Sequence, residues 1–189
     1  RTGVFWLLCV VGFLTNAIGT ALLLNHFSIL EATGASRTQA LRILASYAAF
    51  QVAVTLVTGA LLDRYQPRHL VPFSMVLLAS TCVLAMNANS EILLWLYALS
   101  LGGAYGSQQA IGAAGFAQYF GRDHLGSIRG ASFLFGTSGA ALGPLPFAVS
   151  ADWTGNYSVA LTASCAFATA CGAASFFVGP PLRRGERLN

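Results

Sequence analysis

Lysine is absent from this chain of 189 residues, and charge of either sign is scarce. Charged residues make up 8% of the sequence and hydrophobic residues 56%, whereas soluble domains carry about 25% charged residues. All ten basic side chains other than histidine are arginines. So little charge excludes an ordinary soluble domain and leaves no basic surface for nucleic acid. It indicates an integral membrane protein whose arginines mark its orientation.

Cysteine and histidine are also too few to suggest a cross-linked or metal-binding protein. The cysteines are Cys9, Cys82, Cys165 and Cys171, and the histidines are His26, His69 and His124. All four cysteines lie in apolar stretches, which is typical of small buried side chains rather than of a disulfide framework. The histidines are far apart in sequence, at helix ends or in loops. We therefore expect neither a metal site nor a cofactor.

Six apolar stretches separated by short polar breaks predict an all-α integral membrane fold, a bundle of six transmembrane helices. The helices are expected near 4–28, 37–62, 70–87, 92–118, 130–150 and 157–178. The short connections leave no room for a soluble domain, so the chain is expected to form a single transmembrane domain in the lipid bilayer. Asp63 follows the second span and Asp152 the fifth, on opposite sides, as a three-plus-three inverted repeat would place them.

Arginine is concentrated on one side of this predicted bundle. Six spans put both termini on one side, together with the connections after the second and fourth spans. That side holds Arg1, Arg64, Arg68, Arg122, Arg129, Arg183, Arg184 and Arg187, and the other holds Arg37 and Arg42. Because arginine-rich connections stay in the cytoplasm, both termini are expected to be cytoplasmic. Arg42 is interpreted as an interface residue that reaches the headgroups rather than as an anion ligand.

The fourth span, near 92–118, combines a packing surface with a polar centre. Small residues recur at every fourth position: Ala98, Gly102, Gly106, Ala110 and Ala114. This spacing predicts one flat side on which a neighbouring backbone can approach closely. Tyr105, Gln108 and Gln109 lie near mid-depth, where polar groups are costly against lipid. They are expected to face protein or a wet cavity.

Other polar side chains reach a similar depth in the first, second and fifth spans. They are Asn16, Gln51, Thr137 and Ser138, and with Tyr105, Gln108 and Gln109 they form the candidate solute-binding set. The third and sixth spans have no asparagine or glutamine at that depth. Two interpretations of the set stay open. The side chains contact a solute, or they form hydrogen bonds between helices, which contribute about 0.6 kcal/mol each and up to about 1.7.

Three motifs, in order along the chain, resemble those of the major facilitator superfamily. Gly59-x-Leu61-x-Asp63-Arg64-x-x-x-Arg68 resembles the loop motif G-x-L-x-D-R-x-x-x-R of that family. Gly139-x-x-x-Gly143-Pro144 followed by Asp152-x-Thr154-Gly155-x-Tyr157 resembles its eleventh helix and the loop before the twelfth. Residues 120–130 resemble the loop before the eleventh helix in the monocarboxylate and oxalate/formate-type bacterial branch.

The resemblance implies the C-terminal six-helix half of a twelve-helix secondary transporter in the cell membrane, the inner membrane if the bacterial branch applies. Such a protein moves a small solute by alternating access, here a small organic anion such as a monocarboxylate; a neutral or zwitterionic solute stays open. Helices one, two, four and five of the half would surround the cavity. Gly59, Asp63, Arg64 and Arg68 would govern conformational switching at the cytoplasmic face.

The partner would be a second six-helix half, either a missing N-terminal half or a second copy. No lysine, arginine or acid lies deep in a span, so charges for an anion or a coupling proton would come mostly from that half.

Two other interpretations were weighed. Gly136-x-Ser138-Gly139 resembles the nucleophile region of a rhomboid-type intramembrane protease, but that chemistry needs a later histidine as base, and none follows His124. We reject an enzyme. A non-transporting fragment or a self-associating half-transporter stays open, although the initial Arg1 favours a truncated sequence.

Overall fold

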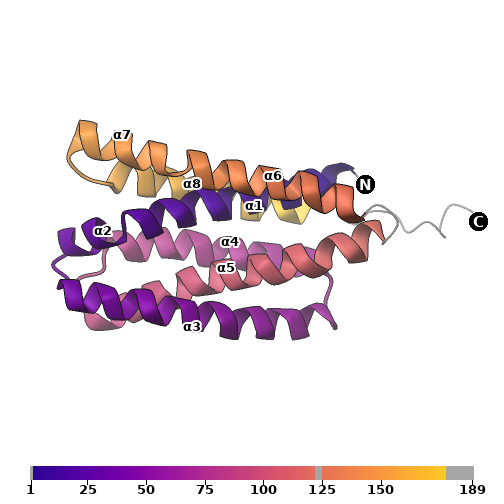
Figure 1. Ribbon diagram of the computed structural model, residues 1–189, viewed down its shortest axis with the longest axis horizontal. Coiled ribbons are helices and arrows are strands. Elements are labelled where there is room, and N and C mark those ends of the chain that lie inside the picture. The colour runs from indigo at the N-terminus through magenta and orange to yellow at the C-terminus, as the bar shows by residue number, and fades with distance from the viewer. Residues whose placement is uncertain (1, 122–124, 178–189) are drawn as a thin grey trace, which may run out of the picture.

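The chain folds as a bundle of long helices that lie side by side. The computed structural model describes residues 2–121 and 125–177, which contain helices and no strands. The helices are α1 (Thr2–Leu24), α2 (His26–Ala32), α3 (Arg37–Leu62), α4 (Pro67–Met86), α5 (Glu91–Phe120), α6 (Leu125–Leu142), α7 (Pro144–Thr154) and α8 (Ser158–Phe177). Figure 1 shows them running along the long axis. The all-α class expected from the sequence is confirmed.

Local sequence signals explain several helix ends. Ser36 caps α3, because its hydroxyl accepts from the Gln39 backbone N–H at 3.3 Å while the Gln39 side chain accepts from the Ser36 backbone N–H at 2.8 Å. Such a reciprocal capping box stabilises the start of a helix, and α3 has the expected bounds of 37–62. Pro144 begins α7, where its missing N–H is no loss, and so divides the fifth predicted stretch into α6 and α7.

The largest difference from the expected bounds lies at the start of α6. This helix begins at Leu125, five residues before the expected start at 130. Arg129 therefore lies inside the helix and not in the preceding connection. The first predicted stretch also differs, since it ends at Leu24 and continues after Asn25 as the short helix α2.

Five helical stretches are long and apolar enough to cross a membrane. They are Gly3–Leu24, Arg37–Leu62, Pro67–Met86, Leu125–Thr154 and Ser158–Phe177. Among the described helices, α5 has the length but not the composition, because its centre carries polar residues and glycines. It runs alongside the other helices and buries fourteen of its residues against them. Five stretches thus support a multi-pass membrane protein. That α5 also crosses the membrane stays a prediction.

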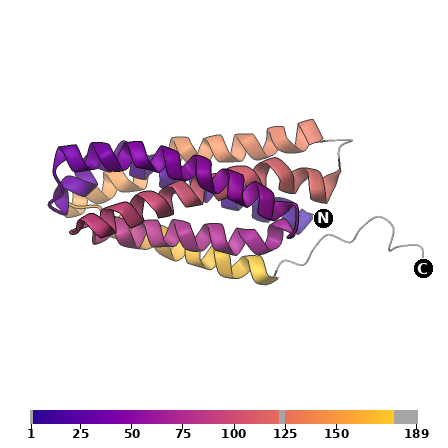
Figure 2. The same ribbon diagram turned by 90° about the horizontal axis from the view of Figure 1, so that it is seen from below.

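Three helix pairs make the most extensive contacts: α3 with α5, α4 with α8, and α1 with α6. In spans, these are the second with the fourth, the third with the sixth, and the first with the fifth. Exchanging the first three spans with the last three leaves this set of pairs unchanged, as an inverted repeat requires. The start of α1 and the end of α8 lie at one end of the bundle (Figures 1 and 2).

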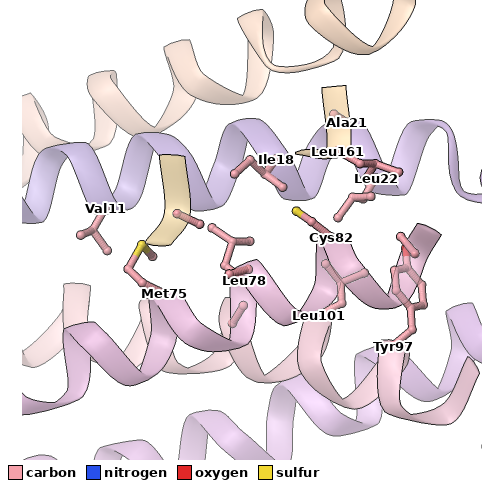
Figure 3. Packing of buried hydrophobic residues seen from close by; sticks show 14 of the residues in the cluster. Val11, Ile18, Ala21, Leu22, Met75, Leu78, Cys82, Tyr97, Leu101 and Leu161 are labelled. Atoms are coloured by element: carbon pink, nitrogen blue, oxygen red, sulfur yellow. The ribbon is translucent and has the colours of Figure 1, made fainter. Parts of the chain in front are cut away.

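The apolar core lies between α1 on one side and α4 and α5 on the other. Val11, Ile18 and Leu22 of α1 meet Met75 and Leu78 of α4 (Figure 3), and all five are buried. Tyr97 and Leu101 of α5 extend the core. These contacts hold α4 between α1, α5 and α8, away from the side of the bundle where α3 and α6 lie.

In the middle of helix α3, large apolar side chains are exposed and a polar side chain is buried, which is the reverse of the pattern in a soluble protein. Its side chains Val52, Leu56 and Val57 are 61, 70 and 59% exposed, whereas Thr58 is buried. Ala40, Ile43 and Leu62 are also buried, toward the two ends of the helix. In the middle of α3, which packs chiefly on α5, the large apolar side chains therefore face outward. This pattern fits a surface covered by lipid or by another membrane domain.

Glycines set the closeness of two helix pairs. A Cβ on Gly106 of α5 would lie 2.5 Å from the Gln51 carbonyl oxygen of α3, and one on Gly102 would lie 2.7 Å from the Tyr47 carbonyl oxygen. The predicted packing surface on α5 is therefore confirmed at these two positions. On α6, a Cβ at Gly139 would overlap the carbonyl of Phe13 in α1.

Candidate functional site

A cleft of about 820 Å³ lies between α1, α3, α5 and α6. Its lining consists of Gly12, Asn16, Gln51, Tyr105, Gln108, Gln109, Gly112, Phe116, Arg129, Gly130, Ser132, Phe133, Gly136, Thr137 and Ala140. None of these residues belongs to α4 or α8. The cleft thus draws on the same four spans that the resemblance placed around a cavity, and the volume is suited to a small solute.

The two longest walls of the cleft have matching lengths. On α5 the lining runs from Tyr105 to Phe116, and on α6 from Arg129 to Ala140. Each wall covers eleven residue steps, or about 16 Å of helix. The two helices run in opposite directions, so Tyr105 and Ala140 lie toward one end and Phe116 and Arg129 toward the other (Figure 1).

Tyr105 closes the end of the cleft far from Arg129. Its ring packs edge-to-face on Tyr47 of α3, with ring centroids 6.1 Å apart. On the other side the ring lies against Gly19 of α1, where any side chain would overlap it. Tyr105 therefore bridges α1 and α3 at this end of the cleft, and the opposite end, near Phe116 and Arg129, is called the mouth below.

Each of two central amides faces a glycine on a neighbouring helix. A Cβ on Gly12 of α1 would lie 3.2 Å from Gln108 Nε2, and a Cβ on Gly136 of α6 would lie 3.2 Å from Asn16 Nδ2. These glycines leave the space that the amides occupy. The sequence therefore places small and polar residues as matched pairs across the α1–α5 and α1–α6 contacts.

The hydrogen bonds of the bundle leave the amide oxygen of Gln108 unpaired. Asn16 Nδ2 donates to the Gly12 carbonyl at 2.8 Å within its own helix, which leaves Asn16 Oδ1 for other partners. Gln108 Oε1 is buried and has no hydrogen-bond partner among the described residues. A buried polar oxygen without a donor is uncommon and calls for a physical explanation. A hydrogen-bond donor on a bound solute would supply the missing partner of this oxygen.

The structure brings together six of the seven residues expected to bind solute. Asn16, Gln51, Tyr105, Gln108, Gln109 and Thr137 all line the cleft. Ser138 does not line it; its side chain is exposed and its hydroxyl donates to the Phe135 carbonyl at 2.8 Å. Thr137 also bonds within its helix, to the Phe133 carbonyl at 2.8 Å. Contact of any of the seven with a solute stays a prediction.

Arg129 is a lining residue that the sequence reasoning missed. It was assigned to the connection before the fifth span because that span was expected to begin at 130. With α6 beginning at Leu125, Arg129 shares a helix face with Ser132, Phe133 and Gly136, at offsets of three, four and seven residues. The offsets were readable in the sequence, but the early helix start was not assigned.

Arg129 also changes the electrostatics expected for this half. It is the single charged group among the described residues that line the cleft, and no described carboxylate lines it. The expectation that cations for an anion come mostly from another half is therefore incomplete, since this half supplies one near the mouth. The described residues contain no cluster of acidic, histidine or cysteine side chains that could hold a metal.

The loop motif at 59–68 lies beyond the mouth end of the cleft and is tied to α5. Asp63 caps the end of α3, and Asp63 and Arg64 are exposed. Gln118 Nε2 donates to the Leu62 carbonyl at 3.1 Å, and the backbone N–H of Arg68 donates to the Tyr119 hydroxyl at 3.1 Å. Two hydrogen bonds thus attach the turn to the C-terminal end of α5. Gly59 has open space around its Cα, so no close packing explains that position.

Comparison with known proteins identifies relatives of the chain. A family model described as Major Facilitator Superfamily matches residues 4–188. One relative is described as an uncharacterized MFS-type transporter, YxiO, of Bacillus subtilis (strain 168). The two are 26% identical over 107 residues, which cover 57% of this chain and 25% of that protein. The chain therefore spans a minor part of the length of this relative.

Proposed function

The chain belongs to the Major Facilitator Superfamily, a family of membrane transporters and not of enzymes, and from that premise we propose its role. We propose that it forms the C-terminal six-helix half of a secondary transporter that carries a small organic anion, such as a monocarboxylate, by alternating access. The cleft is the observation that carries this proposal. Its lining comes from four helices, is rich in amides and hydroxyls, and carries one cation.

The solute site in this proposal is the central part of the cleft. Amides of Asn16, Gln51, Gln108 and Gln109 surround a volume walled by aromatic rings, which suits a small polar molecule with an apolar part. In this proposal the end at Tyr105 is the closed end and the mouth near Phe116 is the open one. The arrangement supports one of the two states that alternating access requires.

The loop motif is proposed to couple movement of the helices to access. Its turn bonds to Gln118 and Tyr119 at the end of α5, and α5 lines the cleft along about 16 Å. A shift of the turn would therefore move a wall of the cleft. Gly59, Asp63, Arg64 and Arg68 are in this proposal the switch residues.

The proposed partner is a second six-helix half that covers the accessible side of the cleft. The outward apolar residues of α3 would face it or lipid. We propose that the protein lies in the cell membrane with both termini on the cytoplasmic side, because eight of the ten arginines lie on that side of a six-span topology. A second copy of this chain could serve as the other half, which gives the alternative of a self-associating half-transporter.

Uptake into proteoliposomes tests this function. A panel of labelled carboxylates and neutral solutes is offered to vesicles that contain a full-length protein, and in parallel to vesicles that contain the 189-residue chain alone. Saturable uptake of carboxylates by the longer protein alone supports the proposal. Saturable uptake by the short chain would favour self-association, and uptake of neutral solutes alone would refute the anionic substrate.

A substitution at Gln109 examines the site itself. Gln109 lines the cleft and its side chain is exposed. Gln109→Ala is expected to reduce uptake while the amount of folded protein is unchanged. Ser138→Ala is the matched control, since Ser138 is equally exposed and lies outside the cleft lining. Equal uptake by the Gln109 variant and the wild type would remove Gln109 from the site.

A further inference from the structure

The cleft has a polarity that neither the composition nor the motifs suggest. Its mouth end is lined by Arg129, and in its deeper part the amide oxygen of Gln108 is buried without a hydrogen-bond partner among the described residues. A guanidinium is a donor group of fixed charge and binds carboxylates through paired hydrogen bonds. A charged donor group and an unpaired acceptor oxygen therefore lie at different levels along the axis of the cleft.

The glycine contacts give the spacing along that axis. Asn16 lies level with Gly136, because its amide fills the space over that glycine. Gly136 follows Arg129 by seven residues, or about 10 Å of helix. Gln108 lies level with Gly12, which precedes Asn16 by four residues, or about 6 Å toward the mouth. The Gln108 amide is thus about 4 Å deeper than the Arg129 backbone along the axis, within one helical turn.

From this arrangement we propose that Arg129 binds the carboxylate of the solute, while the amide oxygen of Gln108 accepts a hydrogen bond from a hydroxyl or amino group of the same molecule. This deepens the proposed function and rests on it. The solute class is then a short carboxylate that carries a second, donor group a few bonds away. A plain carboxylate satisfies Arg129 and leaves the Gln108 oxygen without a donor.

Burial makes the donor group matter for selectivity. A solute without a donor keeps a buried carbonyl oxygen unsatisfied, and sites built for a hydroxyl reject analogues that lack it. A solute without a charge loses the paired bonds to Arg129 and gains nothing in exchange, since no described carboxylate lines the cleft. Both groups are therefore required for tight binding.

The competing explanation is that Arg129 only holds α6 at the membrane surface. An arginine near a helix end can lay its stem along apolar surface and keep its charge in the headgroups. It would then have no effect on ions inside the cleft. Arg42 provides the comparison, because it is an exposed arginine of α3 that does not line the cleft.

A charge-selective thiol reaction tests the location of the cation without any transport. Phe133→Cys in the full-length protein puts a thiol four residues from Arg129, at a side chain that is 74% exposed and lines the cleft. Sulfonatoethyl and trimethylammonioethyl methanethiosulfonate, which are anionic and cationic reagents of similar size, are compared for their rates. The parent protein gives the background from native cysteines, of which Cys9, Cys82 and Cys171 are buried.

The expected effect follows from Coulomb's law. A unit charge about 6 Å away in water changes the local concentration of a univalent ion by about threefold, in opposite senses for the two reagents. Arg129→Gln should therefore lower the anionic-to-cationic rate ratio by about tenfold at low salt, and less at high salt. Arg42→Gln should leave the ratio unchanged. An unchanged ratio in the Arg129 variant would overturn the proposal.

Solute selectivity tests the second part. Uptake by the full-length protein, above that of protein-free vesicles, is measured for 3-hydroxypropionate, propionate and 3-hydroxypropionamide. The hydroxy acid should be taken up best and the amide least. Arg129→Gln should reduce uptake of 3-hydroxypropionate by about 10- to 100-fold, as expected for loss of a charged hydrogen bond. Arg129→Lys should retain part of it, and Gln108→Leu should abolish the preference over propionate.

The thiol reaction and the uptake measurement test different parts of the proposal, so a negative result in one does not decide the other. If the wild type takes up none of the three solutes, the proposed carboxylate transport and the solute part of this inference are both wrong, while the thiol reaction still shows whether Arg129 sets the charge of the cleft. If uptake is strong and unaffected by Arg129→Gln, the function stands and the role of Arg129 is refuted. Equal uptake of the hydroxy acid and propionate by the wild type refutes the donor requirement.

Discussion

Replacing Gly106 by alanine should destabilise the bundle, because α5 and α3 touch at this position through their backbones. The added Cβ would lie 2.5 Å from the Gln51 carbonyl oxygen and 3.0 Å from both the backbone N and Oγ1 of Thr55. Ordinary contact needs about 3.5 Å, so α3 would have to move by about 1 Å. The neighbouring atoms belong mostly to the helix backbone and cannot rotate away.

The size of the effect is the balance of two contributions. Overpacking of this kind costs about 1–3 kcal/mol, and alanine in a helix is favoured over glycine by about 1 kcal/mol. Gly112→Ala is the matched control in the same helix, because nothing lies within 4 Å of a Cβ there. The difference between the two variants therefore isolates the packing cost, which we expect to be about 1–3 kcal/mol.

Thermal unfolding of the purified protein in detergent measures this difference. For a unit of this size, 1 kcal/mol corresponds to about 2–4 °C in the midpoint. Gly112→Ala should match or exceed the wild type, and Gly106→Ala should unfold several degrees below Gly112→Ala. Uptake should also fall in the Gly106 variant, since Gln51 lines the cleft and moves with α3. Equal midpoints for the two variants would refute the close backbone contact between α3 and α5.

Two further outcomes follow from buried polar groups. Thr81→Val removes a hydrogen bond from α4 to Ser100 Oγ of α5 (3.1 Å) and should lower the unfolding free energy by about 0.6 kcal/mol, with Ser100→Ala as the reciprocal variant; a loss of several kcal/mol would contradict a simple interhelical bond. His26 is buried, donates from Nε2 to the Ala40 carbonyl at 2.9 Å, and has a pKa lowered below 6.5 by burial, partly offset by that bond. The unfolded chain therefore binds the proton first as the pH falls, so stability should drop below about pH 6.5. Thermal midpoints of wild type and His26→Gln, compared near neutral and acidic pH, should show the larger acid loss in the wild type, and parallel losses would exclude His26.

Much of the candidate cleft could be read from the sequence because burial of polar groups in a membrane is costly. Asn16, Gln51 and Gln108 stand out in long apolar stretches, and each requires a partner or a cavity. Ser138 met the same criterion and yet lies outside the lining. One residue on a helix changes the direction of a side chain by about 100°, so an uncertainty of one position moves a residue from the cleft to the outer surface.

Arg129 differs from Ser138 in that it lines the cleft although the sequence did not predict it there. A basic residue near a span end was read as a marker of orientation, because the span was expected to start after it. Helix ends are the least certain part of a sequence-based assignment. Five more residues at the start of α6 convert a residue of the connection into a wall of the cleft. The motif at 59–68 could be identified from its pattern, but its bonds to Gln118 and Tyr119 required the fold.

By itself the sequence determined that the chain is a helical membrane protein, which helices carry polar centres, and where small residues permit close contact. These properties depend on composition and on the 3.6-residue period, which are local. Only the tertiary structure decided that Gly106 meets the backbone of α3, that Gly12 and Gly136 make room for amides of other helices, and that Arg129 shares a cleft with Gln108. Those relations join residues far apart in the chain, and the rotation and level of each helix set them through packing.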